Sequence, residues 1–298
     1  VTKIAMSASY DGKQKSGLID KLFVKLVSGS TLSLPSPLEH SLPLSSFELS
    51  ANFEDDGAKW AVSNIQADLG GPQLKLEVQS ERIGLSAEPV KLDVAGDLSN
   101  IPVSKLPLVW PKDVGTDARN WVFQHIKGGN IPLVSFLGQF QFSSSTGLII
   151  DNLSGNMNVR NVVVDYLPPL PAVAIDAADM TFNESRFTIK VGGAQANGLS
   201  VRDGTIVLSG LNEYDQFADI NLLLEGPVAA QLDFINRKPL KFASAMGIDP
   251  EKTSGEASTR LNLYFILEKA LEWTEIEVSA SSQLFDFSMD SAFNGRNI

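Results

Sequence analysis

The side chains best suited to acid–base chemistry near neutral pH are two histidines, His40 and His125. His40 lies in a segment rich in Pro and Ser, and His125 follows Trp121 at helical spacing. This placement favours a packed, hydrogen-bonded role for His125 over a catalytic one. The sequence contains no zinc-protease, nucleophile-elbow, P-loop or dinucleotide-binding motif, which lowers the expectation of an enzyme.

Two groups of acidic residues were considered as sites. The run Glu54-Asp55-Asp56-Gly57 offers oxygen ligands for calcium, but it lacks the alternate spacing and the distal Glu of a calcium-binding loop, so a solvated hairpin turn is favoured. Asp176 and Asp179 are conceivable as a glycosidase pair, yet nothing in the sequence sets the distance between their carboxyl groups. We therefore expect no catalytic residue, no metal site and no cofactor.

The composition excludes further classes of partner and site. The chain of 298 residues has 24 basic and 35 acidic residues, and the basic ones are scattered singly, so nucleic acid is not an expected partner. The absence of cysteine excludes disulfides, thiolate nucleophiles and cysteine-bound metals. No apolar run approaches the roughly 20 residues of a membrane helix. Because the chain begins at Val1 without Met, we interpret it as an excised fragment or a processed form whose targeting information is to be sought elsewhere.

An alternation of apolar and polar residues runs through nearly the whole chain, for example in Leu74-Lys-Leu-Glu-Val-Gln79 and Phe187-Thr-Ile-Lys-Val191. Successive side chains of a strand point to opposite faces, so such segments predict a sheet with one apolar face. Strands are predicted at Leu22–Val27, Phe47–Phe53, Trp60–Leu69, Gln73–Gln79, Val90–Ala95, Val134–Phe142, Leu148–Asn152, Met157–Val164, Val173–Phe182, Phe187–Val191, Thr205–Leu211, Ala218–Leu224, Ser258–Ile266 and Glu275–Ala280.

Helical spacing interrupts this pattern near residues 113–127, 228–236 and 240–247. Thr116 or Asp117 is the predicted N-cap of the first helix, and Gly128 its predicted stop. Pro227 is placed at the first turn of the second. The expected fold is mainly β: an elongated, twisted antiparallel sheet, curved into a groove, with a few short helices.

A weak internal repeat is visible. The strand ending at Gly96 and the strand ending at Gly226 each lead into a helical region, after which Gly129 and Gly255 open new strands. Corresponding positions are separated by about 130 residues. The predicted modules are 1–128 and 129–254, each a set of strands ending in helical segments, and 255–298, which begins a further module.

Several segments resemble one known family. They are Leu108-Val-Trp-Pro-Lys-Asp-Val-Gly-Thr-Asp-Ala-Arg-Asn-Trp-Val-Phe-Gln-His-Ile-Lys-Gly-Gly-Asn-Ile131, Tyr166-Leu-Pro-Pro-Leu-Pro171, Gly198-Leu-Ser-Val-Arg-Asp-Gly-Thr-Ile206 and Phe234-Ile-Asn-Arg-Lys-Pro-Leu-Lys-Phe-Ala-Ser-Ala-Met-Gly-Ile-Asp-Pro250. This pattern is similar to the YhdP-type branch of the AsmA-like bacterial envelope proteins, over roughly residues 105–260.

The resemblance implies a periplasmic protein, anchored in the inner membrane by a segment outside this sequence, that takes part in phospholipid transport to the outer membrane. It implies no catalytic residues. Trp110, Pro111, Arg119 and Trp121 match the family signature, and we expect them to hold a helical cap on the sheet. The expected partner is a phospholipid or another acyl-chain lipid, whereas protein partners are unknown.

The residues expected to line a lipid groove are the apolar members of the alternating strands. They are Leu74, Leu76, Val78, Leu92, Val94, Phe187, Ile189, Val191, Ile220, Leu222 and Leu224. Three alternatives remain. The same residues could pack as a closed sandwich core, the sheet edges could bind proteins as an envelope scaffold, or Trp60, Trp110, Trp121 and Trp273 could gather in a carbohydrate-active site.

Overall fold

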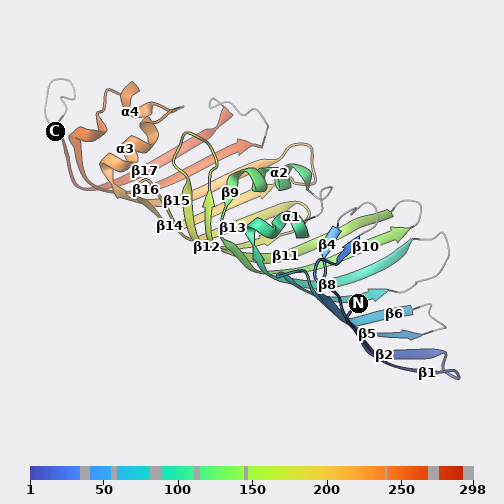
Figure 1. The fold of residues 1–298 in the computed structure, drawn as a ribbon. Helices are drawn as coiled ribbons and strands as arrows, with labels where there is room; N and C mark the ends of the chain where they lie inside the picture. Colours follow the sequence, from blue (N-terminus) through green and yellow to red (C-terminus); the bar gives the residue numbers. More distant parts are fainter. Residues whose placement is uncertain are drawn as a thin grey trace. The chain divides into compact units, whose positions relative to one another are not determined.

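A computed structural model describes most of the chain. The described residues are 1–33, 41–54, 59–80, 89–110, 115–143, 147–238, 240–267 and 275–290. Strands make up 65% and helices 14% of the structure, which confirms the mainly β prediction with few helices. The strands form one large antiparallel sheet that is not closed into a barrel (Figure 1).

In the described part of the chain the main sheet has 15 strands, and along its main path hydrogen-bonded neighbours follow the order of the chain and run antiparallel. The first strands along this path are β1 (Lys3–Asp11), β2 (Ser16–Lys25), β5 (Ser46–Glu54), β6 (Lys59–Asp68), β7 (Gln73–Ser80), β8 (Val90–Pro102), β10 (Asn130–Ser143) and β11 (Gly147–Val164). The path continues through β12 (Val173–Phe182), β13 (Arg186–Ala196), β14 (Leu199–Ser209), β15 (Phe217–Pro227), β16 (Thr253–Ile266) and β17 (Glu277–Met289). Off this path, β9 (Ile126–Lys127) pairs with β11, and β3 (Thr31–Ser33) pairs with β4 (Ser41–Pro43).

The helices are short and follow two strands of the sheet. They are α1 (Leu106–Val109), α2 (Thr116–His125), α3 (Val228–Asn236) and α4 (Phe242–Ala245), with 3₁₀ turns at Val103–Lys105 and Pro250–Lys252. A proline ends the preceding strand in both cases: Pro102 has φ −59° and ψ 137°, and Pro227 has φ −54° and ψ 137°. Proline lacks the backbone donor that a ladder needs, so the chain leaves the sheet there and turns into a helix.

The ends of α2 differ from the prediction. The helix begins at Thr116, the predicted cap, and the Gly115 carbonyl accepts a hydrogen bond from the Arg119 N–H at 2.8 Å, so the cap position is Gly115, one residue earlier than predicted. It ends at His125 rather than at Gly128, because Ile126 and the next residue pair as β9 with β11.

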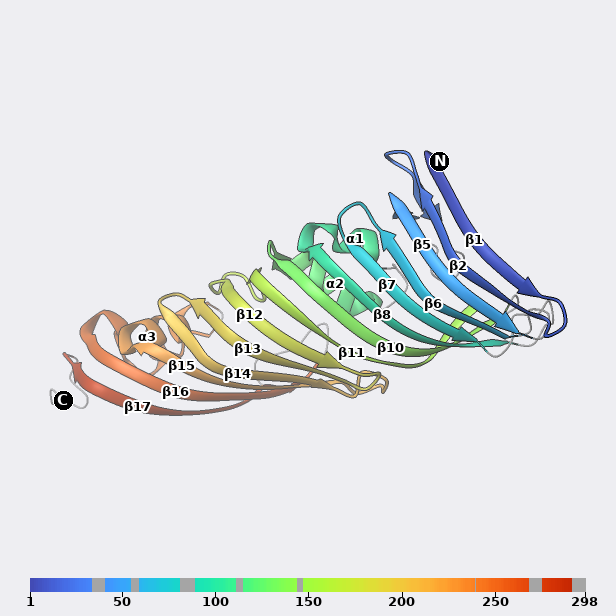
Figure 2. The ribbon, with the colours of Figure 1, turned by 90° about the horizontal axis from the view of Figure 1, so that it is seen from below.

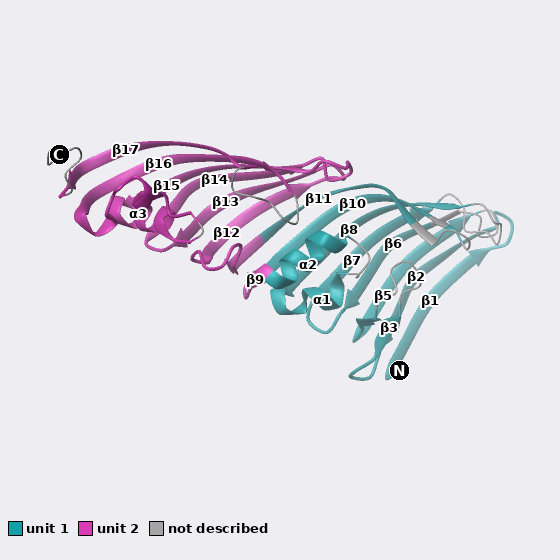
Figure 3. Cartoon of the chain, turned by 90° about the horizontal axis from the view of Figure 1, so that it is seen from above, with its two compact units in different colours: residues 1–124, 130–158 teal, residues 125–129, 159–298 magenta. Residues whose placement is uncertain are grey.

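The chain divides into two compact units (Figure 3). Unit 1 comprises residues 1–124 and 130–158, and unit 2 comprises residues 125–129 and 159–298. Within each unit the strands are bowed (Figure 2). The three sequence modules stay a prediction.

Most predicted strands have other bounds in the structure, by several residues at one end in β2, β8, β13, β16 and β17. Three differences are larger or have a clear cause. β11 is one strand of 18 residues where the sequence predicted Leu148–Asn152 and Met157–Val164 separately. β1 was not predicted, because its alternation uses the small Ala and Ser as well as Ile4 and Met6. β14 begins at Leu199 rather than at Thr205. The predicted turn at Asp55–Gly57 lies outside the described residues.

Candidate functional site

Pairing aligns the apolar side chains of unit 1 in rows that cross the sheet. One row consists of Met6, Leu22, Leu49, Ile65, Leu76, Gly96 and Phe136. The next row consists of Ala8, Ile19, Ala51, Val62, Val78, Val94 and Gly138. Because residues two apart on a strand share a face, both rows lie on the same side of the sheet, which we call the apolar face of unit 1.

Irregular pairings keep this face apolar. Ile19 and Leu22 are three residues apart, and so are Val62 and Ile65, yet each pair lies on the apolar face because the register shifts between its members. A β-bulge inserts one extra residue and so restores the alternation. In the same part of β2, Lys21 forms an ion pair with Glu48 at 2.7 Å.

One end of the apolar face in unit 1 is covered. Leu44, which follows β4, forms a buried cluster with Ala67 and Leu69, and Val109 of α1 packs against it. Leu74, one of the predicted lining residues, also packs against this cluster. Leu74 therefore belongs to the covered end of the face.

The apolar face of unit 2 is built in the same way. One row consists of Met180, Ile189, Ile206, Ile220, Leu263 and Val278. A second consists of Ala178, Val191, Gly204, Leu222, Leu261 and Ala280. A third, at the β12–β13 turn, consists of Phe182, Phe187, Leu208, Ala218 and Phe265.

Helix α3 covers the other end of this face (Figure 3). The Gln231 side chain donates to the Ala257 carbonyl at 3.0 Å and accepts from the Thr259 hydroxyl at 2.6 Å. Thr259 Oγ1 also lies 2.8 Å from Ser282 Oγ. Val228 and Ala257 are buried here. The apolar rows therefore end at a small polar network beneath α3.

A second set of polar contacts ties α3 to the β13–β14 turn. Arg237 donates from Nε and Nη2 to Asp233 Oδ2 at 3.1 and 2.8 Å, and Asn197 Nδ2 donates to the same oxygen at 3.0 Å. These hydrogen bonds, from Arg237 first and then Asn197, lower the pKa of Asp233. Asn197 and Gly198 both have positive φ, as the tight hairpin turn requires.

The predicted lining residues lie on the two apolar faces. In unit 1, Leu74, Leu76, Val78, Leu92 and Val94 share the apolar face; in unit 2, Phe187, Ile189, Val191, Ile220, Leu222 and Leu224 share the other. Val191 is buried, and the other ten are only partly buried. In a closed sandwich, side chains at the middle of an inner face would be buried by a facing sheet. Their role in binding stays a prediction.

Several residues on the two apolar faces were not predicted as lining residues. They include Ile19, Leu22, Leu49, Ile65 and Phe136 in unit 1, and Met180, Ile206, Leu208, Leu261, Leu263 and Phe265 in unit 2. The alternation of Leu261-Asn-Leu-Tyr-Phe265 was sufficient to find the last three.

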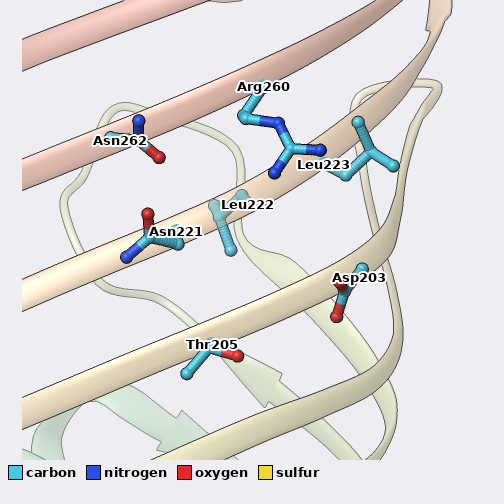
Figure 4. Close-up of a pocket in the computed structure, with 7 residues that line it drawn as sticks. All are labelled: Asp203, Thr205, Asn221, Leu222, Leu223, Arg260 and Asn262. Carbon is cyan, nitrogen blue, oxygen red and sulfur yellow. The ribbon is translucent and has the colours of Figure 1, made fainter.

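The opposite face of unit 2 is polar. Figure 4 shows a depression there between Asp203, Asn221 and Arg260, with Asn262 on the neighbouring strand. Its volume of about 70 Å³ is far below that of a small-molecule pocket. This face is suited to contact with water rather than to holding a ligand.

The candidate acid–base residues have structural partners. His125 Nδ1 lies 2.6 Å from the Asp165 carbonyl oxygen, and the Asp165 N–H donates to the His125 carbonyl at 2.8 Å, which confirms the packed, hydrogen-bonded role. Asp179 is exposed and lies 3.7 Å from Arg160. Within the described ranges, no group of three or more His, Asp or Glu residues is placed to hold a metal ion. His40 lies outside those ranges.

The signature residues near α2 are partly brought together. Arg119 donates to the Trp110 carbonyl at 3.1 Å, and its guanidinium lies 4.4 Å from the Phe123 ring centroid. Trp110 and Phe123 meet edge to face at 6.0 Å. Trp121, in contrast, is 44% exposed. Pro111, Trp273 and the side chain of Trp60 lie outside the described part, so the proposed tryptophan cluster is untested.

Among the described helices, none has the length and hydropathy needed to cross a bilayer. A family model described as "YhdP protein" matches residues 16–286. Neither the curated proteins nor the solved structures contain a match to this chain.

Proposed function

The chain belongs to the YhdP family of bacterial envelope proteins, and on that premise we propose that it shields phospholipid acyl chains in an apolar β groove. It would be one part of a periplasmic bridge that carries lipid between the inner and outer membranes. The family is not a known enzyme family, and the proposed role is non-catalytic.

The observation that carries this proposal is the pair of apolar faces whose central side chains are only partly buried. Leu76 and Val94 in unit 1, and Ile220 and Leu222 in unit 2, have no facing layer that buries them fully. Large exposed apolar areas on a folded protein mark places where another apolar body binds. Apolar faces that extend over several strands and over most of each strand's length suit long hydrocarbon chains better than a compact ligand.

The free energy of exposing an acyl chain to water explains why the lipid needs shielding. An acyl chain of about 16 carbons, at roughly 0.8 kcal/mol per methylene, costs on the order of 12 kcal/mol to expose to water. A strip of aliphatic and aromatic side chains removes most of this cost without specific contacts. The polar side chains of the opposite face, such as Asn221 and Asn262, keep the carrier hydrated.

The test is the lipid content of the purified protein, measured by organic extraction and mass spectrometry. Leu222→Asp and Leu76→Asp place a charge on the apolar faces and should lower bound lipid roughly tenfold or more. The matched controls Asn221→Asp and Gln79→Asp place the charge on the other face of the same two strands, β15 and β7, and should retain lipid.

Circular dichroism of each variant must show an intact fold. Unchanged lipid in both apolar-face variants would refute the proposal. Absence of lipid from the unaltered protein, together with a captured protein partner, would favour an envelope scaffold that binds other proteins through its sheet edges.

A further inference from the structure

The two ends of the apolar face in unit 2 differ in chemistry. At the β12–β13 turn the face ends in an aromatic rim, defined as Phe182, Phe187 and Phe265. The rings of Phe182 and Phe187 stack at 6.0 Å between centroids with 12° between their planes. All three rings are partly exposed, so they offer surface at the edge of the strip.

The turns next to the aromatic rim carry exposed polar side chains. Asn183 and Ser185 form the β12–β13 turn through a 3.0 Å hydrogen bond from the Ser185 N–H to the Asn183 side chain. The neighbouring β14–β15 loop contains Glu213 and Asp215, and its Tyr214 is 99% exposed. A polar group bound at this end would therefore remain in contact with water.

The opposite end is closed. Leu199, Val228 and Ala257 are buried under or beside α3, and the polar atoms of Gln231 and Thr259 already have partners in each other, the Ala257 carbonyl and the Ser282 hydroxyl. A charged headgroup placed there would lose its water without gaining a partner, which costs several kcal/mol. An amphiphile on this face is thus forced to keep its polar end at the aromatic rim.

The length of the strip fits a tail laid along the strands. From Ala218 at the rim row to Leu224 near α3, six residues of β15 span about 20 Å. The hydrocarbon depth of one membrane leaflet is about 15 Å, half of a bilayer core. One tail therefore fits between the rim and the helix.

We infer that acyl-chain lipids lie along the strands of unit 2, with the headgroup end at the aromatic rim and the terminal methyl groups toward α3. The inference rests on the proposed function and adds an orientation and a headgroup-level contact site to it. Rings of Phe, Tyr and Trp favour such a boundary between hydrocarbon and water.

Unit 1 offers an independent parallel. Tyr10 and Phe53 stack at 6.0 Å with 19° between their planes, across Gly17, which lies opposite both in the pairing. A Cβ atom on Gly17 would come 2.2 Å from the Phe53 ring, so the glycine makes room for the stack. This stack lies at the end of the strands away from the covered cluster of Leu44 and Leu69.

The absence of cysteine makes a direct test available. Leu208→Cys places a fluorescent label at the rim row, and Val201→Cys places it near α3 on the same strand, β14. Lipid-stripped protein is loaded with phosphatidylcholine that carries a nitroxide quencher either near the headgroup end of the tail or near its terminal methyl. Val207→Cys, on the opposite face, is the control for quenching by free lipid.

The rim label should lose more fluorescence with the nitroxide near the headgroup end, and the α3-side label should lose more with the nitroxide near the methyl end. Equal quenching of both labels, or the reverse order, would overturn the orientation while leaving lipid binding intact. No quenching at either label, with no lipid bound, would instead remove the proposed function.

A second variant tests the rim itself. Phe182→Leu combined with Phe187→Leu keeps the face apolar but removes the stack, and is expected to weaken phosphatidylcholine binding about fivefold. The same double variant should also reduce the difference between the two nitroxide positions at the Leu208→Cys label. Full retention of affinity and of that difference would show that the rings do not contact the lipid.

Discussion

Gly255 of β16 lies so close to Phe285 of β17 that a Cβ atom on Gly255 would come 2.6 Å from the Phe285 carbonyl oxygen. Gly255 has φ +100°, a conformation that residues with a side chain rarely adopt. The register shifts at this point, between the pairs Ser254 with Ser288 and Glu256 with Phe285. The irregularity places both Ala257 and Met289 in buried positions.

Gly255→Ala is expected to lower the free energy of unfolding by roughly 1–3 kcal/mol, because the new methyl group meets backbone that cannot turn aside. Urea denaturation followed by circular dichroism measures the change. Gly12→Ala is the control, since a Cβ there meets nothing closer than 3.7 Å. Equal stability of the two variants would contradict the strained geometry.

Thr259→Val should weaken the attachment of α3 to the sheet. The substitution keeps the shape of the side chain but leaves Gln231 Oε1 without its donor and Ser282 without its partner, at a cost of about 1 kcal/mol. Hydrogen exchange of the α3 amides should speed up accordingly. Thr205→Val, on the polar face, should leave that exchange unchanged; faster exchange in both variants would point to a general loss of stability.

The Asp233–Arg237 contact predicts a pH dependence. Because hydrogen bonds from Arg237 and Asn197 lower the pKa of Asp233 in the folded state, the stabilisation is present above the unfolded pKa and is lost as pH falls through the folded one. Both side chains are at least 40% exposed, so solvent limits the effect to less than about 1 kcal/mol.

Asp233→Asn should therefore lose less stability than the unaltered protein between neutral and acidic pH, as measured by urea denaturation at a series of pH values. Asp179→Asn, whose side chain is 74% exposed and lies 3.7 Å from Arg160, is the control. Identical acid sensitivity of the Asp233 variant and the unaltered protein would exclude this contribution.

The hydroxyl of Tyr166 should ionise at a higher pH than that of an ordinary tyrosine. Burial raises the pKa of its hydroxyl from 10.0 to about 12. A raised folded pKa means that the stabilisation is complete below pH 10 and is lost as pH rises through about 12. Ultraviolet titration of the protein and of Tyr166→Phe should differ by one phenol that ionises near pH 12; a difference centred near pH 10 would contradict the burial.

Much of the fold was accessible from the amino-acid sequence because the alternation is local. Val173–Phe182 was predicted with the bounds of β12, and the helix predicted at 228–236 has the bounds of α3. β11 was divided because Ser154-Gly155-Asn156 is typical of a turn, whereas pairing with neighbouring strands carries the chain straight through it. At this segment, pairing within the sheet outweighs the turn propensity of the local sequence.

The candidate site could be predicted from the sequence only in part. Alternation placed Leu76 and Leu222 on apolar faces, but it does not say what covers a face. Leu74 packs against a cluster that includes Leu44, which comes from a distant segment, and no periodicity predicts this cover. The bulge between Val62 and Ile65 could not be predicted either, because a spacing of three between apolar residues looks like an interruption of the strand.

The extra residue between Ile19 and Leu22 shows that the apolar face of β2 depends on the number of residues between its side chains as well as on their types. Inserting or deleting one residue elsewhere in β2, without a compensating bulge, would turn the side chains of one half of the strand to the opposite face, whereas exchanging Ile19 for Val or Leu would change little.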